Sequence, residues 1–257
     1  MNLICSFLIV NHVKYSIGSK VENGMVAKMK KNINKDNAII IACSMLKDEL
    51  LYIIKKIQLD LEIDWIEKGL HEFPEKLNQE LKSHIDQYSD RKYILLAYGM
   101  CGLSVLNLYS SNATMIIPMF DDCVRMLMCK EKGEKIPTKP NHFYFTKAWI
   151  DSERFLFTDF NNYIEDYGEE DGMAIIEMMI GAYEAIDFID NGTYNVMSVC
   201  DSMKEEASKY GLSCGCVEGT LRVLEKMLTG NWDDEFVVKQ PGEMITLEDF
   251  DHRAVCE

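Results

Sequence analysis

Three cysteines stand at the ends of apolar runs in this sequence of 257 residues, in positions where a thiol can take part in chemistry. Cys43 ends the run "NAIIIAC", Cys101 lies between two glycines in "YILLAYGMCG", and Cys123 ends "ATMIIPMFDDC". Thiolates are soft ligands that select zinc, copper(I) or iron–sulfur clusters. His71, in "GLHEFP", adds an imidazole, which zinc also accepts. These residue types predict a metal site with Cys43, Cys101 and Cys123 as ligands and His71 as the fourth.

The residues beside the cysteines add candidate contacts to a bound cofactor. Gly99 and Gly102 would let the main chain approach a bound group closely, and loop amides there would contact its anionic groups. Asp121 and Asp122 either orient a ligand or bind a hard cation, or they form a turn or a helix N-cap. Each cysteine also has an ordinary interpretation, because free cysteine is among the most buried residue types.

The three cysteines are too far apart in the sequence for a local zinc-binding motif. Their separations are 58 and 22 residues, and no C-x-x-C occurs. A shared site therefore requires a fold that brings the ends of separate elements together.

Strand and helix patterns alternate through this part of the chain. Apolar runs predict strands over 37–45, 62–70, 92–102 and 113–123, and amphipathic patterns predict helices over 46–59 and 74–88, with a short helix over 104–111. The alternation predicts an α/β fold with a doubly wound, mostly parallel sheet and helices on both faces. The carboxyl ends of such strands lie along one edge, where these folds bind ligands. Cys43, Cys101, Cys123 and His71 are all expected at that edge.

The pattern changes after residue 124. A strand is predicted over 141–150, and two long helical patterns cover 151–168 and 171–192. Residues 193–240 then read as strand, helix, strand and helix.

We expect a single domain over residues 36–257, with a helical cap or lobe within about 125–192 and a peripheral N-terminal extension over 1–35. Cys214 and Cys216 form a C-x-C motif in the last part of this domain. On a strand, their side chains would face the same way and could join a cluster.

The composition excludes several classes of partner. A formal net charge of −15, from 42 acidic and 27 basic residues, repels phosphate backbones and anionic lipids, so neither nucleic acid nor a membrane is expected. Nine irregularly spaced cysteines do not resemble a secreted disulfide framework. The N-terminal run "LICSFLIV" is too short to span a membrane and is a poor signal peptide. We expect reduced thiols in the cytoplasm, and the oligomeric state stays open.

Six stretches of the chain carry a resemblance to a known family. They are "IIACSMLKDEL", "GLHEFPEKLNQELKSHID", "ILLAYGMCG", "IIPMFDDCV", "HFYFTKAWI" and "RVLEKMLTGNWDDEFVVKQPGE". In this order they resemble the domain of unknown function 1638 family, over about residues 37–245. The family pattern has cysteine, histidine, cysteine and cysteine at the positions of Cys43, His71, Cys101 and Cys123. It differs just before the last cysteine, where this chain has Met119 and Asp121 in place of arginine and histidine, which indicates a divergent member.

The resemblance implies a metabolic setting rather than a reaction. Members occur in methanogens and anaerobic bacteria, often beside corrinoid-dependent methyltransferases. We therefore expect a metal-binding cytosolic protein linked to corrinoid-dependent methyl-group metabolism, with zinc as cofactor and an iron–sulfur cluster or a corrinoid as alternatives. A corrinoid protein or a methyltransferase is the implied partner. Two roles stay open. The chain is either an enzyme with a zinc-activated thiol for methyl transfer, or a non-catalytic accessory protein that docks through its acidic cap.

Overall fold

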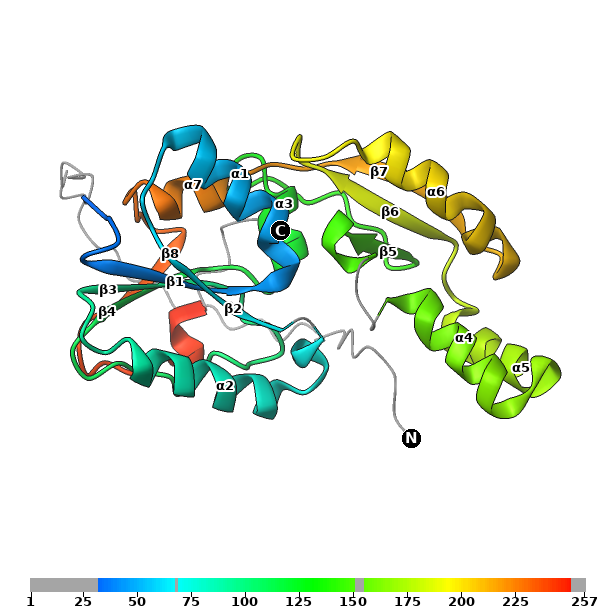
Figure 1. Cartoon of the computed structure of the whole chain (residues 1–257), viewed down its shortest axis with the longest axis horizontal. Coiled ribbons are helices and arrows are strands. Elements are labelled where there is room, and N and C mark those ends of the chain that lie inside the picture. Colours follow the sequence, from blue (N-terminus) through cyan, green and yellow to red (C-terminus); the bar gives the residue numbers. More distant parts are fainter. Residues whose placement is uncertain (1–31, 68, 151–154, 251–257) are drawn as a thin grey trace, which may run out of the picture.

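The computed structural model describes residues 32–67, 69–150 and 155–250. Within these ranges the chain forms two sheets with helices packed against them, which lie side by side in Figure 1. The α/β fold predicted from the sequence, with a mostly parallel sheet, is confirmed. Most of the predicted N-terminal extension, residues 1–35, lies outside the described residues, and Ile33 within it is buried in the core.

The first sheet is formed by the first half of the chain and one late strand. Its order is β2–β1–β3–β4–β8, and every neighbouring pair is parallel except β4 and β8. Cys43 lies beside Ile66, and Ala42 lies beside Ala97, so β1, β2 and β3 end at one edge. The five strands are β1 (Ala38–Cys43), β2 (Ile63–Ile66), β3 (Tyr93–Ala97), β4 (Thr114–Pro118) and β8 (Phe236–Lys239).

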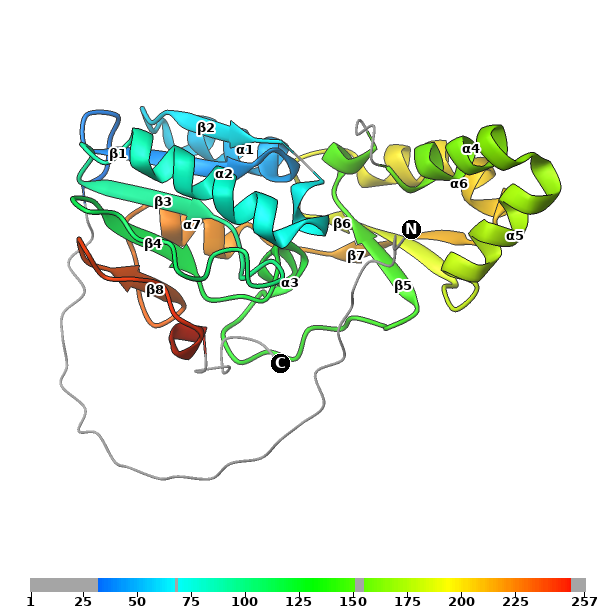
Figure 2. The same ribbon diagram turned by 90° about the horizontal axis from the view of Figure 1, so that it is seen from below.

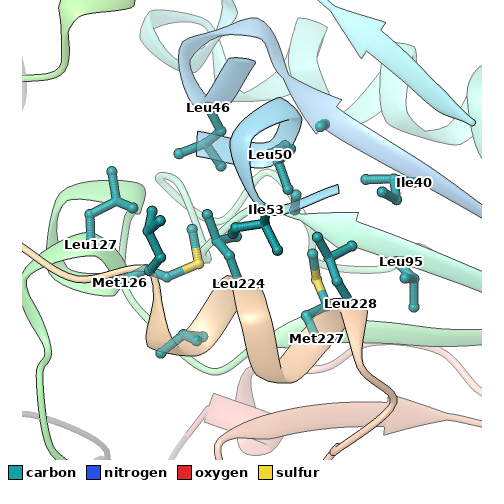
Figure 3. Packing of buried hydrophobic residues seen from close by; sticks show 14 of the residues in the cluster. Ile40, Leu46, Leu50, Ile53, Leu95, Met126, Leu127, Leu224, Met227 and Leu228 are labelled. Atoms are coloured by element: carbon teal, nitrogen blue, oxygen red, sulfur yellow. The ribbon is translucent and has the colours of Figure 1, made fainter. Parts of the chain in front are cut away.

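Helices cover both faces of the first sheet, which explains why β1 and β3 are apolar at almost every position. α1 (Lys47–Ile57) and α7 (Arg222–Leu228) pack on one face, and α2 (Pro74–Gln87) packs on the other (Figure 1). Pro74 occupies the first turn of α2, as predicted. Figure 3 shows the core between this sheet and the helices α1 and α7, which includes the buried side chains of Ile40, Leu46, Leu50, Ile53, Leu95, Met227 and Leu228.

Leu95 of β3 is fully buried in this core, as is Ile40 of β1. Adjacent residues of the same strands face the opposite core, where Ile39 and Ile94 pack with Leu81 of α2. Because successive strand residues point to opposite faces, both faces of the sheet are apolar and need cover. The strands are thereby fixed between two helical layers, and only their ends are available to form a site.

Two strands of the second sheet, β5 and β6, lie in the region predicted as a helical cap or lobe, and β7 follows it in the chain. The sheet has the order β5–β6–β7, and both pairs are parallel. The helix predicted over 171–192 is therefore too long, because its last part forms β6, whose run "AIDFID" pairs with a strand on each side. The order predicted over 193–240 is also reversed: it begins with a helix and ends with a strand. The strands are β5 (His142–Phe145), β6 (Ala185–Asp190) and β7 (Ser213–Glu218).

One face of the second sheet is covered by its own helices and the other contributes to the first core. α4 (Leu156–Tyr167), α5 (Glu169–Ile180) and α6 (Val196–Lys209) supply an aromatic-rich core with β6. On the opposite face, Ile189 is buried in the same core as Ile40 of the first sheet. Among the helices of the described residues, none combines the length and the apolar character needed to cross a membrane.

The two sheets meet where their strands end. In Figures 1 and 2 the carboxyl ends of the first sheet point toward the second sheet, and segments that follow β5, β6 and β7 contact segments that follow β1 and β4. The hydrogen bonds run from Thr146 Oγ1 to the Met45 carbonyl (3.1 Å), from Asn191 Nδ2 to Glu49 Oε1 (2.7 Å) and from Thr220 N to the Leu127 carbonyl (2.6 Å). The predicted ligand-binding edge therefore faces a second parallel sheet.

Candidate functional site

The three candidate cysteines all follow strands of the first sheet. Cys43 is the last residue of β1, Cys101 lies in the loop after β3, and Cys123 is the first residue of α3 (Cys123–Met128), which follows β4. Since β1, β3 and β4 are parallel neighbours, these positions lie along one edge of the sheet (Figure 2). All three cysteines carry reduced thiols, whereas Cys129 is disulfide-bonded.

Backbone hydrogen bonds hold the loop after β3 against the loop after β4. Met100 N donates to the Phe120 carbonyl (2.7 Å), and Cys101 N donates to the Asp121 carbonyl (2.8 Å). Gly99 makes this approach possible, because a Cβ at this position would lie 2.7 Å from the Phe120 carbonyl oxygen. The sequence predicted that the main chain at Gly99 would closely approach a bound group. In the structure it closely approaches the loop after β4. This approach fixes Cys101 beside the N-terminus of α3, where Cys123 lies.

The electrostatics of the thiols indicate that they share one region. Burial raises the pKa of Cys101 well above its usual value, and the charges of Asp122 and Cys43 raise it further. Burial also raises the pKa of Cys123, followed by the charges of Cys101, Asp122 and Cys43. Each residue as a whole keeps some solvent-accessible surface. At neutral pH both groups are therefore protonated thiols, and ionisation of one opposes ionisation of the next.

Tyr98, the first residue after β3, adds a polar atom to the same region. Its side chain is buried, with 3% exposure, and its hydroxyl has no hydrogen-bond partner among the described residues. Tyr98 is buried in the core against which Cys43 and Cys101 pack. Burial raises the pKa of Tyr98, and the charges of Cys43, Cys101 and Cys123 raise it further. An unpaired buried hydroxyl costs about 1–3 kcal/mol, so its position is informative. It marks a place where a hydrogen-bonding ligand would fit.

The backbone around Cys101 adopts conformations that side chains disfavour. Cys101 has φ of +43°, and Leu103 and Asn107 have φ of +75° and +63°. Residues in this left-handed region store about 1–3 kcal/mol of strain each, and such residues concentrate at ligand sites. The short helix predicted over 104–111 is wrong, because this segment forms a series of turns instead.

An open groove of about 850 Å³ borders the loop that carries Cys101. Gly102, with φ of +67°, supplies its turn, and a Cβ there would meet Pro74 Cγ at 3.2 Å. The groove is lined by Phe73, Pro74, Asn78, Gly102, Leu103 and Leu106. The groove thus lies between the start of α2 and the loop residues that directly follow Cys101.

The remaining candidate residues have different outcomes. Asp122 is the N-cap of α3, and its Oδ1 accepts a hydrogen bond from Arg125 N (2.7 Å), which confirms the capping interpretation. Burial raises the pKa of its carboxyl group. The Asp121 side chain is 66% exposed and lies 3.7 Å from Arg125 Nε. The main chain of His71 lies in a short helical turn before α2, at the expected edge, but its side chain is outside what the structure describes.

The donor atoms fit a soft metal ion in kind but are not assembled around one point. Within residues 32–67, 69–150 and 155–250, no three histidine, cysteine, aspartate or glutamate side chains are grouped so that they would hold a metal ion as they stand. Zinc needs sulfur ligands at about 2.3 Å, so one of the segments must move for three thiolates to bind the same ion.

Two buried polar residues near this edge were not anticipated from the sequence. Tyr98 ends the apolar run "YILLAY", so its ring could be expected in the core at the end of a strand. A buried tyrosine hydroxyl usually needs a hydrogen-bond partner, and this was the available signal for a polar site. Glu49 of α1 is fully buried, and its Oε2 has no hydrogen-bond partner among the described residues. Its place on a helix with an apolar face gave no indication of burial.

Comparison with known proteins identifies one family. The family model described as "Protein of unknown function (DUF1638)" matches residues 65–228, which include Cys101, Cys123 and the second sheet. No curated protein and no solved structure matches the chain.

Proposed function

The chain belongs to the DUF1638 family, and from that premise we propose that it binds a thiophilic metal ion, zinc in the first place, through Cys43, Cys101 and Cys123. The observation that carries this proposal is the delivery of three reduced thiols by three neighbouring strand ends to one region beside the unpaired hydroxyl of Tyr98. His71 is the proposed fourth ligand. Three thiolates and an imidazole form a closed zinc site, and an open fourth position would make the site catalytic.

A bound cation explains why Cys101, Cys123 and Asp122 are buried close together better than core packing alone does. Cys101, Cys123 and Asp122 all have raised pKa values because they are buried, and the two thiols also oppose each other's ionisation. A soft divalent ion would displace the thiol protons and neutralise the resulting charge. Thiols that served only as core residues would not require the strained backbone of Cys101.

The proposal requires a movement, and the hydrogen bonds indicate which segment moves. Cys101 and Cys123 are connected through the paired loops after β3 and β4. Cys43 instead leads into η1 (Ser44–Leu46), a short 3-10 turn that joins β1 to α1. We therefore expect binding to draw Cys43 toward the other two thiols.

When bound, zinc would supply a stabilised thiolate or a polarised fourth ligand. The chain's own residues would exclude water and orient the ion: Gly99 permits the loop contact, and the Tyr98 hydroxyl would donate a hydrogen bond to a thiolate or to an exogenous ligand. The proposed setting is corrinoid-dependent methyl-group metabolism, with a corrinoid protein or methyltransferase as partner. That setting rests on the family resemblance, and a titration with methylcobalamin tests whether a corrinoid itself binds.

The metal content of the anaerobically purified protein tests the central claim. We expect about one equivalent of zinc and no visible absorption, whereas broad visible absorption would assign an iron–sulfur cluster to the same thiols. Cys101→Ser should lose the metal, and Cys200→Ser, which changes a reduced thiol in α6, should keep it. Absence of metal from the wild type, together with no cobalt(II) or zinc uptake on titration, would refute the proposal.

A further inference from the structure

A second group of thiols lies on the second sheet, away from the candidate metal site. Cys214 and Cys216 both belong to β7, where they pair with Ile186 and Phe188 of β6. As predicted for a strand, the two cysteines lie on one face of the sheet. Ile186 and Phe188 lie on the same face and pack in the core with residues of α6. Cys200 of α6 is in that core, and Figure 1 shows α6 lying along β7.

The inner two thiols of this group share one core. Cys200 is buried in the core of the second sheet, and Cys214 packs against the same core. The charge of Cys200 raises the pKa of Cys214, and the charge of Cys216 raises the pKa of Cys200. Cys200 is 4% exposed, whereas Cys216 is exposed to solvent on an edge strand. One thiol of the group is therefore accessible to a reagent, and the other two belong to the core behind it.

The charges around the group suit a reactive thiol relay. Burial raises the pKa of Cys214 to about 11. Lys204, which lies on α6 one turn after Cys200, lowers the pKa of Cys214. Lys204 has the same effect on Cys200. The two inner sulfurs rest as thiols, and a nearby ammonium group favours each thiolate when it forms.

We propose that Cys200, Cys214 and Cys216 form a thiol–disulfide site that reacts with hydroperoxides, with Cys216 as the entry thiol and a Cys200–Cys214 disulfide as the product. The position of Cys200 and Cys214 in one core, where α6 packs on β7, and the exposure of Cys216 on the same strand carry this proposal. It is independent of the metal site.

The proposed chemistry balances with one hydroperoxide as the oxidant. The Cys216 thiolate attacks the terminal peroxide oxygen, so an S–O bond forms, the O–O bond breaks and the alcohol or water leaves. Cys214 then attacks the Cys216 sulfur, and water leaves after taking a proton. Finally the Cys200 thiolate attacks the Cys214 sulfur and releases Cys216 as a thiolate. In total, two thiols and one hydroperoxide give one disulfide, water and one alcohol or a second water.

The inner pair is the better final partner for geometric reasons. Alternate residues of an extended strand are about 6.6 Å apart at Cα, which is near the upper limit for a disulfide between Cys214 and Cys216. Cys200 approaches Cys214 from a different element, α6, within the same core. The resulting disulfide would fasten α6 to the edge strand of the second sheet.

Peptide mass spectrometry of the full chain tests the proposal. The reduced protein is treated with hydrogen peroxide at an equal concentration, alkylated and digested without reductant. We expect a peptide linked through Cys200 and Cys214. In Cys216→Ser the same linkage should form at least tenfold more slowly, and in Cys200→Ala a dimedone adduct or a linkage should remain on Cys214 or Cys216.

Two results would overturn the proposal. One is a folded wild-type protein, judged by circular dichroism, in which peroxide leaves Cys200 and Cys214 fully alkylatable. The other is an equal rate of Cys200–Cys214 linkage with and without the Cys216 thiol, because that would remove Cys216 as the entry point. Ser208→Ala, which changes an exposed hydroxyl group on α6, serves as the matched control, and its linkage rate should equal that of the wild type.

Discussion

Replacement of Glu49 by glutamine should make the protein more stable at pH 8 than at pH 5, relative to the wild type. The carboxyl group of Glu49 is fully buried, where Oε1 accepts a hydrogen bond from Asn191 (2.7 Å) and Oε2 has no partner among the described residues. Burial raises its pKa from 4.5 to about 7, although the Asn191 hydrogen bond lowers it. The folded protein therefore holds a proton on Glu49 at pH values where the unfolded chain has lost it.

The sign of the effect follows from proton binding. Between pH 4.5 and about 7 the folded state binds one more proton than the unfolded state, so the free energy of unfolding falls as pH rises. At about 1.4 kcal/mol per pH unit, a pKa change from 4.5 to about 7 makes a loss of about 3 kcal/mol. Above the folded pKa the loss is complete. Glutamine has no proton to lose and keeps an oxygen for Asn191, so Glu49→Gln removes this slope.

Urea unfolding at a series of pH values between 4 and 8 measures the difference. The stability of Glu49→Gln relative to the wild type should rise by about 3 kcal/mol across this range. Glu165→Gln, which changes an exposed carboxylate on α4, is the matched control and should follow the wild-type curve. Parallel curves for Glu49→Gln and the wild type would show that Glu49 is ionised in the folded protein and would refute the reasoning.

Three further substitutions test the site and its support by urea unfolding. Gly99→Ala should destabilise the protein by about 2–4 kcal/mol, because its Cβ meets backbone atoms at 2.7–2.8 Å, whereas Gly211→Ala, in open space at positive φ, should cost about 1 kcal/mol. Tyr98→Phe should stabilise the metal-free protein by about 1–3 kcal/mol and weaken zinc binding; unchanged zinc affinity would contradict the role of its hydroxyl. Burial would raise the pKa of Glu235, but hydrogen bonds from Arg222 and Lys226 hold it below its usual value. Glu235→Gln should therefore cost about 3–5 kcal/mol at pH 7 and less below pH 4, where the wild type loses this contribution.

The sequence predicted the edge that carries the thiols because that prediction depends on strand ends alone. Apolar runs that stop at Cys43, after Tyr98 and before Cys123 mark where parallel strands leave the core, whatever lies between them. Pro74 and Asp122 were predictable for a similar reason, since a first-turn proline and an N-cap act within one turn of helix.

Features that depend on contacts between distant segments were not predictable. The run "AIDFID" continues a helical pattern, and only its pairing with β5 and β7 makes it a strand. Glu49 is buried because Asn191, 142 residues later, approaches it from the second sheet. Cys200 gave no signal, because it shares a core with Cys214 only when α6 packs on β7.

The position of Glu49 connects the proposed metal site to the arrangement of the two sheets. Cys43 and Glu49 belong to the same short segment, and that segment is bound to the second sheet by the Thr146–Met45 and Asn191–Glu49 hydrogen bonds. Cys101 and Cys123 are bound to each other instead. If Cys43 moves toward them to complete a metal site, these two hydrogen bonds must stretch or move with it. Binding of a metal ion and the contact between the sheets are then thermodynamically linked, so whatever loosens one of those hydrogen bonds should change the affinity for the ion.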